Sequence, residues 1–267
     1  MYMNIHKKTN TGAKISSVRY NILVSDDATK SKDGGHSCPP EEDWPFFRPR
    51  DAIRIHHNRL PHWQQDAASY FVTWHLADSI SQRQLNEWRE QRDHWLILHP
   101  KPWDETVRHE YSTRFIVVME QWLDAGMGSC LLRNQSVSEI VSTALLFFHH
   151  QRYTVDCFVI MPNHVHVVFR LHEGYRLEAV IKSWKGYTAR QINLATGQSG
   201  SVWMEDYWDT LIRNPEHLER CRSYVEHNPI KAGLQVGAYR LFENPQTGDR
   251  NVPPPGQHGR GAFLPPF

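Results

Sequence analysis

The sequence predicts an α+β fold, an antiparallel sheet with helices on one face, for the middle of the chain. Runs of β-branched and aromatic residues at 69–77, 153–160 and 164–171 are typical of strands. Apolar residues spaced about 3.6 apart predict helices over 113–123, 137–150 and 177–193. Strands and helices alternate as β-α-(α)-β-β-α-β-α, an order that suits helices packed on a single sheet.

The first strand, SYFVTWHLA at 69–77, is followed by a polar, tryptophan-rich stretch with helical character at 82–94. A turn-rich connection, DAGMGSCLLRNQ, separates the helices at 113–123 and 137–150. Ser136 and Ser138 are both candidate caps for the second helix. Glu139 lies three residues after Ser136, which favours Ser136 through a capping box.

The next two strands are expected to form a hairpin over 153–171, because Met161-Pro162-Asn163 supplies turn chemistry between them. A helix over 177–193 and a strand-like segment over 202–212 follow. Asn214 is the expected cap of a last helix with Pro215 at its first position. That helix is expected to end near His227, because Pro229 disfavours helical geometry at the residue before it.

The chain is expected to contain one folded domain, at 67–238, between two irregular ends. Residues 1–66 include SKDGGHSCPPEEDWPFFRPRD, rich in Pro, Gly and charge, and are predicted to be a poorly ordered extension. Residues 239–267 end in VPPPGQHGRGAFLPPF and are predicted to be a Pro/Gly-rich tail.

Composition excludes several classes of protein. The chain of 267 residues has 30 Lys and Arg against 29 Asp and Glu, so any nucleic-acid site must be a local patch. No apolar run reaches membrane-span length, and the N-terminus lacks a signal-peptide core. The 4 cysteines form no CxxC pair, which argues against a zinc ribbon and favours a reducing, cytoplasmic location.

The triplet His164-Val165-His166 is the first candidate for chemistry. Side chains at i and i+2 of a strand share a face, about 7 Å apart, so two imidazoles can hold one divalent ion. Val165, Val167, Phe169 and Leu171 occupy the opposite, core-like face. Arg170 continues the histidine face, where it can meet a phosphate. Surface histidines without a role are the alternative, since two ligands do not complete a metal site.

The last helix offers a third ligand. Tyr224 and Asn228 are four residues apart, so both project from one helical face. The alternative for Tyr224 is a packing residue with its hydroxyl at the rim of the core.

MPNHVHVV, SWKGYTARQIN and VWMEDYWDTLIRNPEHLERCRSYVEHNPIKAGL together resemble the HUH single-tyrosine transposases, most of all the REP-associated tyrosine transposases. The resemblance covers about 70–235 and is strongest over 153–234. It implies a ferredoxin-like or RRM-like sheet, with His164, His166 and Asn228 as metal ligands and Tyr224 as the nucleophile. It also implies single-stranded or hairpin DNA as substrate, often a repeated palindrome, and a monomer or homodimer.

The implied reaction is DNA strand cleavage and transfer, as in transposition and recombination, through a 5′-phosphotyrosine. Mixed nitrogen and oxygen ligands suit Mg²⁺ or Mn²⁺. A domesticated hairpin-binding protein that does not cut, and a metal-dependent phosphodiesterase that uses water, are the alternatives.

Basic residues near these elements are candidate phosphate contacts. Lys182 and Lys185 lie three apart on the helix at 177–193, and Arg190 follows them. Arg213 precedes the cap Asn214. A solvated helix face explains the two lysines equally well.

Overall fold

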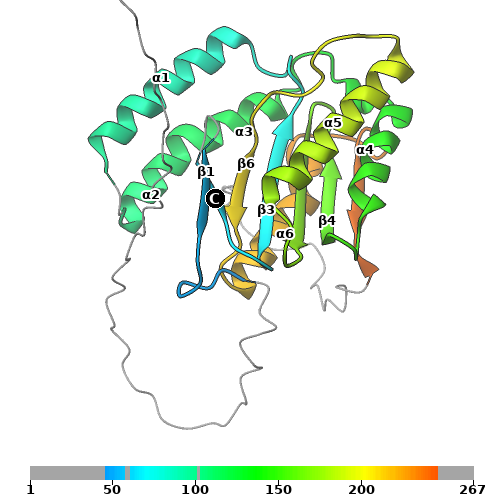
Figure 1. The fold of residues 1–267 in the computed structure, drawn as a ribbon. Coiled ribbons are helices and arrows are strands. Elements are labelled where there is room, and N and C mark those ends of the chain that lie inside the picture. Colours follow the sequence, from blue (N-terminus) through cyan, green and yellow to red (C-terminus); the bar gives the residue numbers. More distant parts are fainter. Residues whose placement is uncertain (1–45, 58–60, 101–102, 246–267) are drawn as a thin grey trace, which may run out of the picture. The chain divides into compact units, whose positions relative to one another are not determined.

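The computed structural model describes residues 46–57, 61–100 and 103–245. Its centre is a five-stranded antiparallel sheet in the order β6-β3-β5-β4-β7 (Figure 1). The strands are β3 (Ser69–His75), β4 (Tyr153–Ile160), β5 (His164–Leu171), β6 (Trp208–Leu211) and β7 (Arg240–Glu243). The predicted α+β class is confirmed, and the histidine triplet lies on the central strand, β5.

The hairpin of β4 and β5 forms as predicted, with Val159 opposite His166 and Ile160 opposite Val165. The Met161 amide donates to the His164 carbonyl at 2.9 Å and closes the turn. The register shifts between Val155 and Cys157, at a bulge that contains Asp156. Bulges re-aim side chains, and Asp156 here accepts two hydrogen bonds from Arg222 of the last helix.

One face of the sheet packs on α4 (Gln135–Phe147) and α5 (Leu177–Thr196), with η3 (Leu131–Arg133) leading into α4. Val165, Val167 and Phe169 point toward these helices, as their alternation predicts. They meet Leu145 of α4 and Trp184 of α5 in a hydrophobic core.

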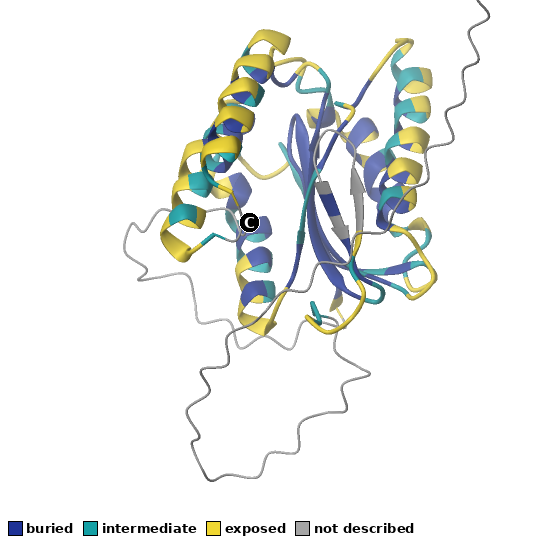
Figure 2. Cartoon of the chain, turned by 60° about the vertical axis from the view of Figure 1, so that its left-hand side comes forward, coloured by how far each residue is buried: buried dark blue, intermediate teal, exposed yellow. Residues whose placement is uncertain are grey.

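The other face is covered by α6 (Pro215–Lys231), so the prediction of helices on one face alone is wrong. Phe71, Val159 and Val168 of the sheet pack on Cys221 and Val225 of α6. The sheet is therefore buried between helical layers, as Figure 2 shows. The stripe of apolar residues on α6 is the physical reason, because a sheet face with apolar residues of its own is stabilised by that cover.

A third cluster joins the helices between β3 and α4. These are α1 (Gln82–Leu98), α2 (Glu105–Tyr111), the π-helical turn η2 (Ser112–Ile116) and α3 (Val117–Asp124). Leu85 and Trp88 of α1 pack against Phe115, Met119 and Leu123. The predicted helix at 113–123 is thus a π-helical turn that runs on into α3.

Both predicted domain boundaries shift. Residues 54–57 and 61–64, assigned to a poorly ordered extension, form a two-stranded sheet of β1 (Arg54–His57) and β2 (Pro61–Gln64). The buried His62 of β2 bonds to the carboxylates of Asp206 and Asp209 and ties that hairpin to the main domain. At the other end, β7 extends the sheet into the predicted tail. Residues 1–45 and 246–267 lie outside the described part.

Three helix and strand limits also differ from prediction. Asn134, not Ser136, caps α4 by accepting from the Ser136 amide. The predicted strand 202–212 is reduced to β6. Asn214 caps α6 as predicted, but the helix continues through Pro229 to Lys231. Proline within a helix removes one hydrogen bond, and here Pro229 is buried, so packing offsets that loss.

Candidate functional site

The structure brings together the four residues singled out from the sequence. His164 and His166 project from β5 with ring centroids 4.7 Å apart. The ring of Tyr224, on α6, lies edge-on to His166 at 5.3 Å. Asn228 lies one helical turn further along α6, near His164. The histidine face of β5 and the Tyr224 face of α6 therefore contact each other.

All four side chains are buried, and each has a polar atom without a hydrogen-bond partner among the described residues. Their exposed fractions are 0% for both histidines, 2% for Tyr224 and 1% for Asn228. The unpartnered atoms are Nε2 of each histidine, the Tyr224 hydroxyl and both amide atoms of Asn228. A buried polar group without a partner costs about 1–3 kcal/mol. This cluster therefore has unused capacity for a polar or ionic ligand.

The hydrogen bonds of Asn163 fix which nitrogen of His164 carries the proton. The Asn163 Nδ2 group donates to the carbonyls of Leu123 and Met127, at 3.1 and 3.2 Å. Its Oδ1 must then accept, so the His164 Nδ1–H donates to it, at 2.7 Å. The lone pair on His164 Nε2 is left facing the cluster, the arrangement in which second-shell partners hold metal-binding histidines.

His166 is also held by a hydrogen bond, with Nδ1 2.7 Å from the hydroxyl of Thr73 on β3. Burial lowers the pKa of His164 to about 3, with the neighbouring His75 adding to the effect. Burial also lowers the pKa of His166, and the His164 charge acts in the same direction. Both imidazoles are therefore neutral near pH 7, the form that binds metals.

Charged residues from α3 and α6 border the cluster. The Lys231 ammonium lies 2.9 Å from Asp124 of α3 and 5.8 Å from the centroid of the Tyr224 ring. Glu120, one turn before Asp124, is 3% exposed, and burial raises its pKa to about 8. The Asp124–Lys231 pair thus links α3 to the end of α6 beside the tyrosine.

The prediction that the histidine face stays open for a ligand is wrong in this structure. α6 packs on it, residues of α3 lie beside Thr73 on the same face, and Tyr224 is only 2% exposed. The described residues hold no group of three or more His, Cys, Asp or Glu that is placed to bind a metal. A metal at the cluster would need the Asn228 amide as its third ligand.

The predicted phosphate contacts on α5 lie on the opposite face of the sheet. Their helix packs on the Val165 side of β5, away from the histidines. Lys182 and Arg190 are exposed there. Lys185 is engaged, because its ammonium donates to the carbonyls of Glu205 and Asp206, at 2.7 and 3.1 Å.

The two remaining basic candidates lie closer to α6. Arg170 is half-buried on the histidine face of β5, as its spacing predicts. Arg213 is exposed immediately before α6, and partial burial followed by the charge of Arg108 lowers its pKa. Of the five predicted basic contacts, Arg170 is the one that shares the strand face of the two histidines.

Sequence reasoning did not assign His75 and Trp208 to a site. His75 is the cross-strand partner of His164, and Trp208 is the partner of Thr73. Their rings stack with centroids 5.4 Å apart. Alternation along β3 was the available signal, since Thr73 and His75 fall on the face opposite to Val72 and Trp74.

Residues 132–228 match the family model described as "Transposase IS200 like". The matched segment is somewhat more than a third of the chain, and it contains all four residues of the cluster. The match confirms the resemblance to the tyrosine transposases for this segment. No curated protein matches the chain.

Two solved structures are similar over most of their length. A REP-associated tyrosine transposase bound to a REP hairpin has 15% identity and a TM-score of 0.40, covering 67% of this chain and 76% of that one. A candidate transposase of Deinococcus radiodurans R1 has 13% identity and a TM-score of 0.26, covering 60% of this chain and 89% of that one.

Among the described residues, no helix has both the length and the apolar character of a membrane span.

Proposed function

We propose that the chain is a metal-dependent enzyme that cleaves and rejoins single-stranded or hairpin DNA through a 5′-phosphotyrosine on Tyr224. The supporting observation is the convergence of His164, His166, Tyr224 and Asn228 with their unpartnered atoms in one buried cluster. The family match over 132–228 supports the same function.

The donor set fits a divalent cation. His164 and His166 present neutral Nε2 atoms, and Asn228 contributes an amide oxygen without a partner. Such mixed nitrogen and oxygen ligands accept Mg²⁺ or Mn²⁺. When bound, the ion supplies Lewis-acid stabilisation of charge on the scissile phosphate. Asn163 and Thr73 would keep the two imidazoles oriented toward it.

Tyr224 provides the nucleophile in this mechanism. Its oxygen attacks phosphorus, forms the tyrosyl–phosphate bond and releases the 3′-hydroxyl of the cut strand as the phosphodiester bond breaks. The phenolic proton leaves to water or to the departing oxygen. Lys231, with its ammonium near the ring, is placed to stabilise the negative charge that develops on the phenolate. Reversal with another 3′-hydroxyl rejoins DNA and frees Tyr224.

The burial of Tyr224 requires that the site open before DNA reaches it. The elements that cover it are α6 itself and α3, joined by the Asp124–Lys231 ion pair. Because the Asp124 side chain is 14% exposed and the Lys231 side chain 37%, the pair is partly screened by water. Separation of α3 from the end of α6, at this partly exposed ion pair, is the opening that we propose.

The alternatives predict different products. A hairpin-binding protein without cleavage has no use for the Tyr224 hydroxyl, and a phosphodiesterase that uses water leaves no protein–DNA bond. Denaturing gel electrophoresis with end-labelled hairpin DNA and Mn²⁺ distinguishes them, because only the proposed reaction yields a covalent adduct.

The decisive variant is Tyr224→Phe, which removes one oxygen and keeps the ring. The adduct is expected to disappear while hairpin affinity changes by less than about twofold. Tyr187→Phe is the matched control, since Tyr187 is exposed on α5. An adduct of normal yield with Tyr224→Phe removes the residue from the proposed role.

A further inference from the structure

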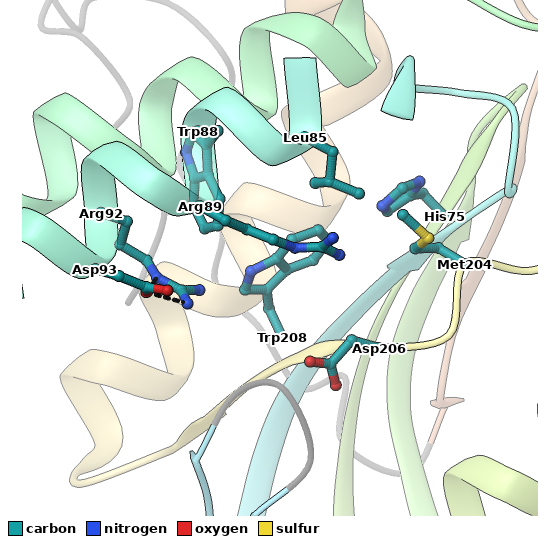
Figure 3. Close-up of a pocket in the computed structure, with 9 residues that line it drawn as sticks. All are labelled: His75, Leu85, Trp88, Arg89, Arg92, Asp93, Met204, Asp206 and Trp208. Atoms are coloured by element: carbon teal, nitrogen blue, oxygen red, sulfur yellow. Dashed lines mark hydrogen bonds and ion pairs between the residues drawn. The ribbon is translucent and has the colours of Figure 1, made fainter. Parts of the chain in front are cut away.

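A cavity of about 380 Å³ lies between α1 and the edge strand β6, outside the Tyr224 cluster. Its size is in the range of small-ligand sites. Figure 3 shows the residues that line it. They come from β3, α1 and the segment that leads into β6, and they are His75, Leu85, Trp88, Arg89, Arg92, Asp93, Met204, Asp206 and Trp208.

The cavity walls combine flat rings with cations. Trp208 stacks on His75 with an interplanar angle of 17°, and Trp88 lies on the opposite, α1 side. Arg89 extends from α1 across the cavity toward His75 (Figure 3). Rings that accept stacking, beside a guanidinium, are the elements with which proteins hold nucleotides of single strands.

His75 supplies a buried polar atom without a partner. Its Nδ1–H donates to the Leu76 carbonyl at 2.8 Å, so Nε2 carries the lone pair. The side chain is 0% exposed, and Nε2 has no hydrogen-bond partner within the part of the chain that the structure describes. A ligand in the cavity that donates an N–H, as every nucleobase can, would satisfy it.

The cavity adjoins the proposed cleavage site along β3. His75 is the cross-strand partner of His164, and Trp208 is the partner of Thr73, which holds His166. A strand of DNA whose scissile phosphate meets Tyr224 would therefore have a neighbouring nucleotide at the cavity.

We propose that this cavity holds one nucleotide of the single-stranded DNA next to the scissile phosphate, an inference that rests on the proposed function. The base stacks against the indole of Trp208, donates to His75, and its phosphate meets Arg89. Arg92 is paired with Asp93 at 2.7 Å, and Asp206 also lines the cavity. The two arginines and two aspartates of this lining cancel in formal charge, which suits a single phosphodiester better than a free triphosphate.

The test is a coupling between one base and one side chain. Fluorescence anisotropy measures binding of a labelled single strand of about 16 nucleotides, a length typical of single-strand sites, to protein carrying Tyr224→Phe. One abasic position is moved along the strand. At the position that occupies the cavity, the missing base is expected to weaken binding about tenfold. With Trp208→Leu added, the same abasic position is expected to cost less than about twofold.

A second variant keeps the test valid if Trp208→Leu does not fold. Arg89→Ala is expected to reduce the salt dependence of binding by about one phosphate contact. Arg83→Ala is the matched control on the same helix, because the Arg83 side chain is 84% exposed and does not line the cavity. Equal salt slopes for the two variants overturn the proposal.

Two further results also overturn it. One is an abasic penalty that Trp208→Leu leaves unchanged at every position. The other is that deoxyadenosine monophosphate binds alone and Arg89→Ala abolishes this binding, while no abasic position changes the affinity for the strand. The cavity would then be a site for free nucleotides. The adduct assay separates the two proposals. If the adduct forms but no base is coupled to Trp208, the proposed function stands and the nucleotide site is refuted. If coupling is found but no adduct forms, the nucleotide site stands and the proposed cleavage is refuted.

Discussion

Replacing Glu120 by Gln is expected to stabilise the protein, and to do so increasingly as pH rises. Glu120 lies on α3 beside the Tyr224 cluster, is 3% exposed, and its Oε2 has no partner. Burial, followed by the charge of Asp124, raises its pKa from 4.5 to about 8, although Lys231 opposes the shift. The folded protein therefore holds this carboxyl protonated near pH 7.

The sign follows from proton binding. Below about pH 4.5 the carboxyl is protonated in both folded and unfolded states and has no effect on their balance. Between about pH 5 and pH 8 the unfolded chain ionises while the folded chain does not, so the wild type loses about 1.4 kcal/mol of stability per pH unit. The total is on the order of 4 kcal/mol. Glutamine has nearly the same shape and cannot ionise, so the variant avoids this loss.

Urea denaturation of wild type and Glu120→Gln at several pH values checks the expectation. The difference between their free energies of unfolding should grow steadily up to about pH 8 and then level off. Glu87→Gln is the control, since the Glu87 side chain is 58% exposed on α1. A constant difference between wild type and Glu120→Gln across this range would refute the argument from burial.

Three other predictions concern α6 and its surroundings. Arg222→Leu should lower the free energy of unfolding, measured by urea denaturation, by about 3–5 kcal/mol, because it leaves the carboxylate of Asp156 buried without its partner. Arg220→Leu, at an exposed position of the same helix, should lower it little. Asp124→Asn should speed adduct formation on hairpin DNA by loosening α3 from α6, and a slower reaction would contradict that opening motion. Lys182→Ala should leave the salt slope of DNA binding unchanged, because α5 lies behind the sheet, and a slope reduced by about one unit would place DNA on that face.

The parts of the site that the sequence predicts are those fixed by local periodicity. Two histidines at i and i+2 must share a strand face, and Tyr224 and Asn228 must share a helix face, whatever surrounds them. The hairpin turn before His164 follows equally from short-range chemistry, as does the Asn214 cap. Their convergence came from the family resemblance, and the ring distances now support it.

The parts that could not be predicted depend on long-range packing. Nothing near Ser136 in the sequence shows that Asn134 is the residue whose side chain reaches the helix amide. Helical geometry persists through Pro229, which is buried, a condition that a local rule for proline does not contain. The short strands β1 and β2 gain their stability from contacts such as His62 with Asp209, far apart in the sequence.

The burial of the cluster under α6 also depends on long-range packing, and it has an energetic cost. Five polar atoms without partners, on His164, His166, Tyr224 and Asn228, lie in a region that is otherwise well packed. At about 1–3 kcal/mol each, their burial is a sizeable fraction of the stability of a typical domain. Apolar residues of similar shape would avoid that cost, so packing alone does not account for these side chains. A ligand that engages all four, such as a divalent cation with a phosphate, would offset it, and the energy gained would also help to open α3 from α6.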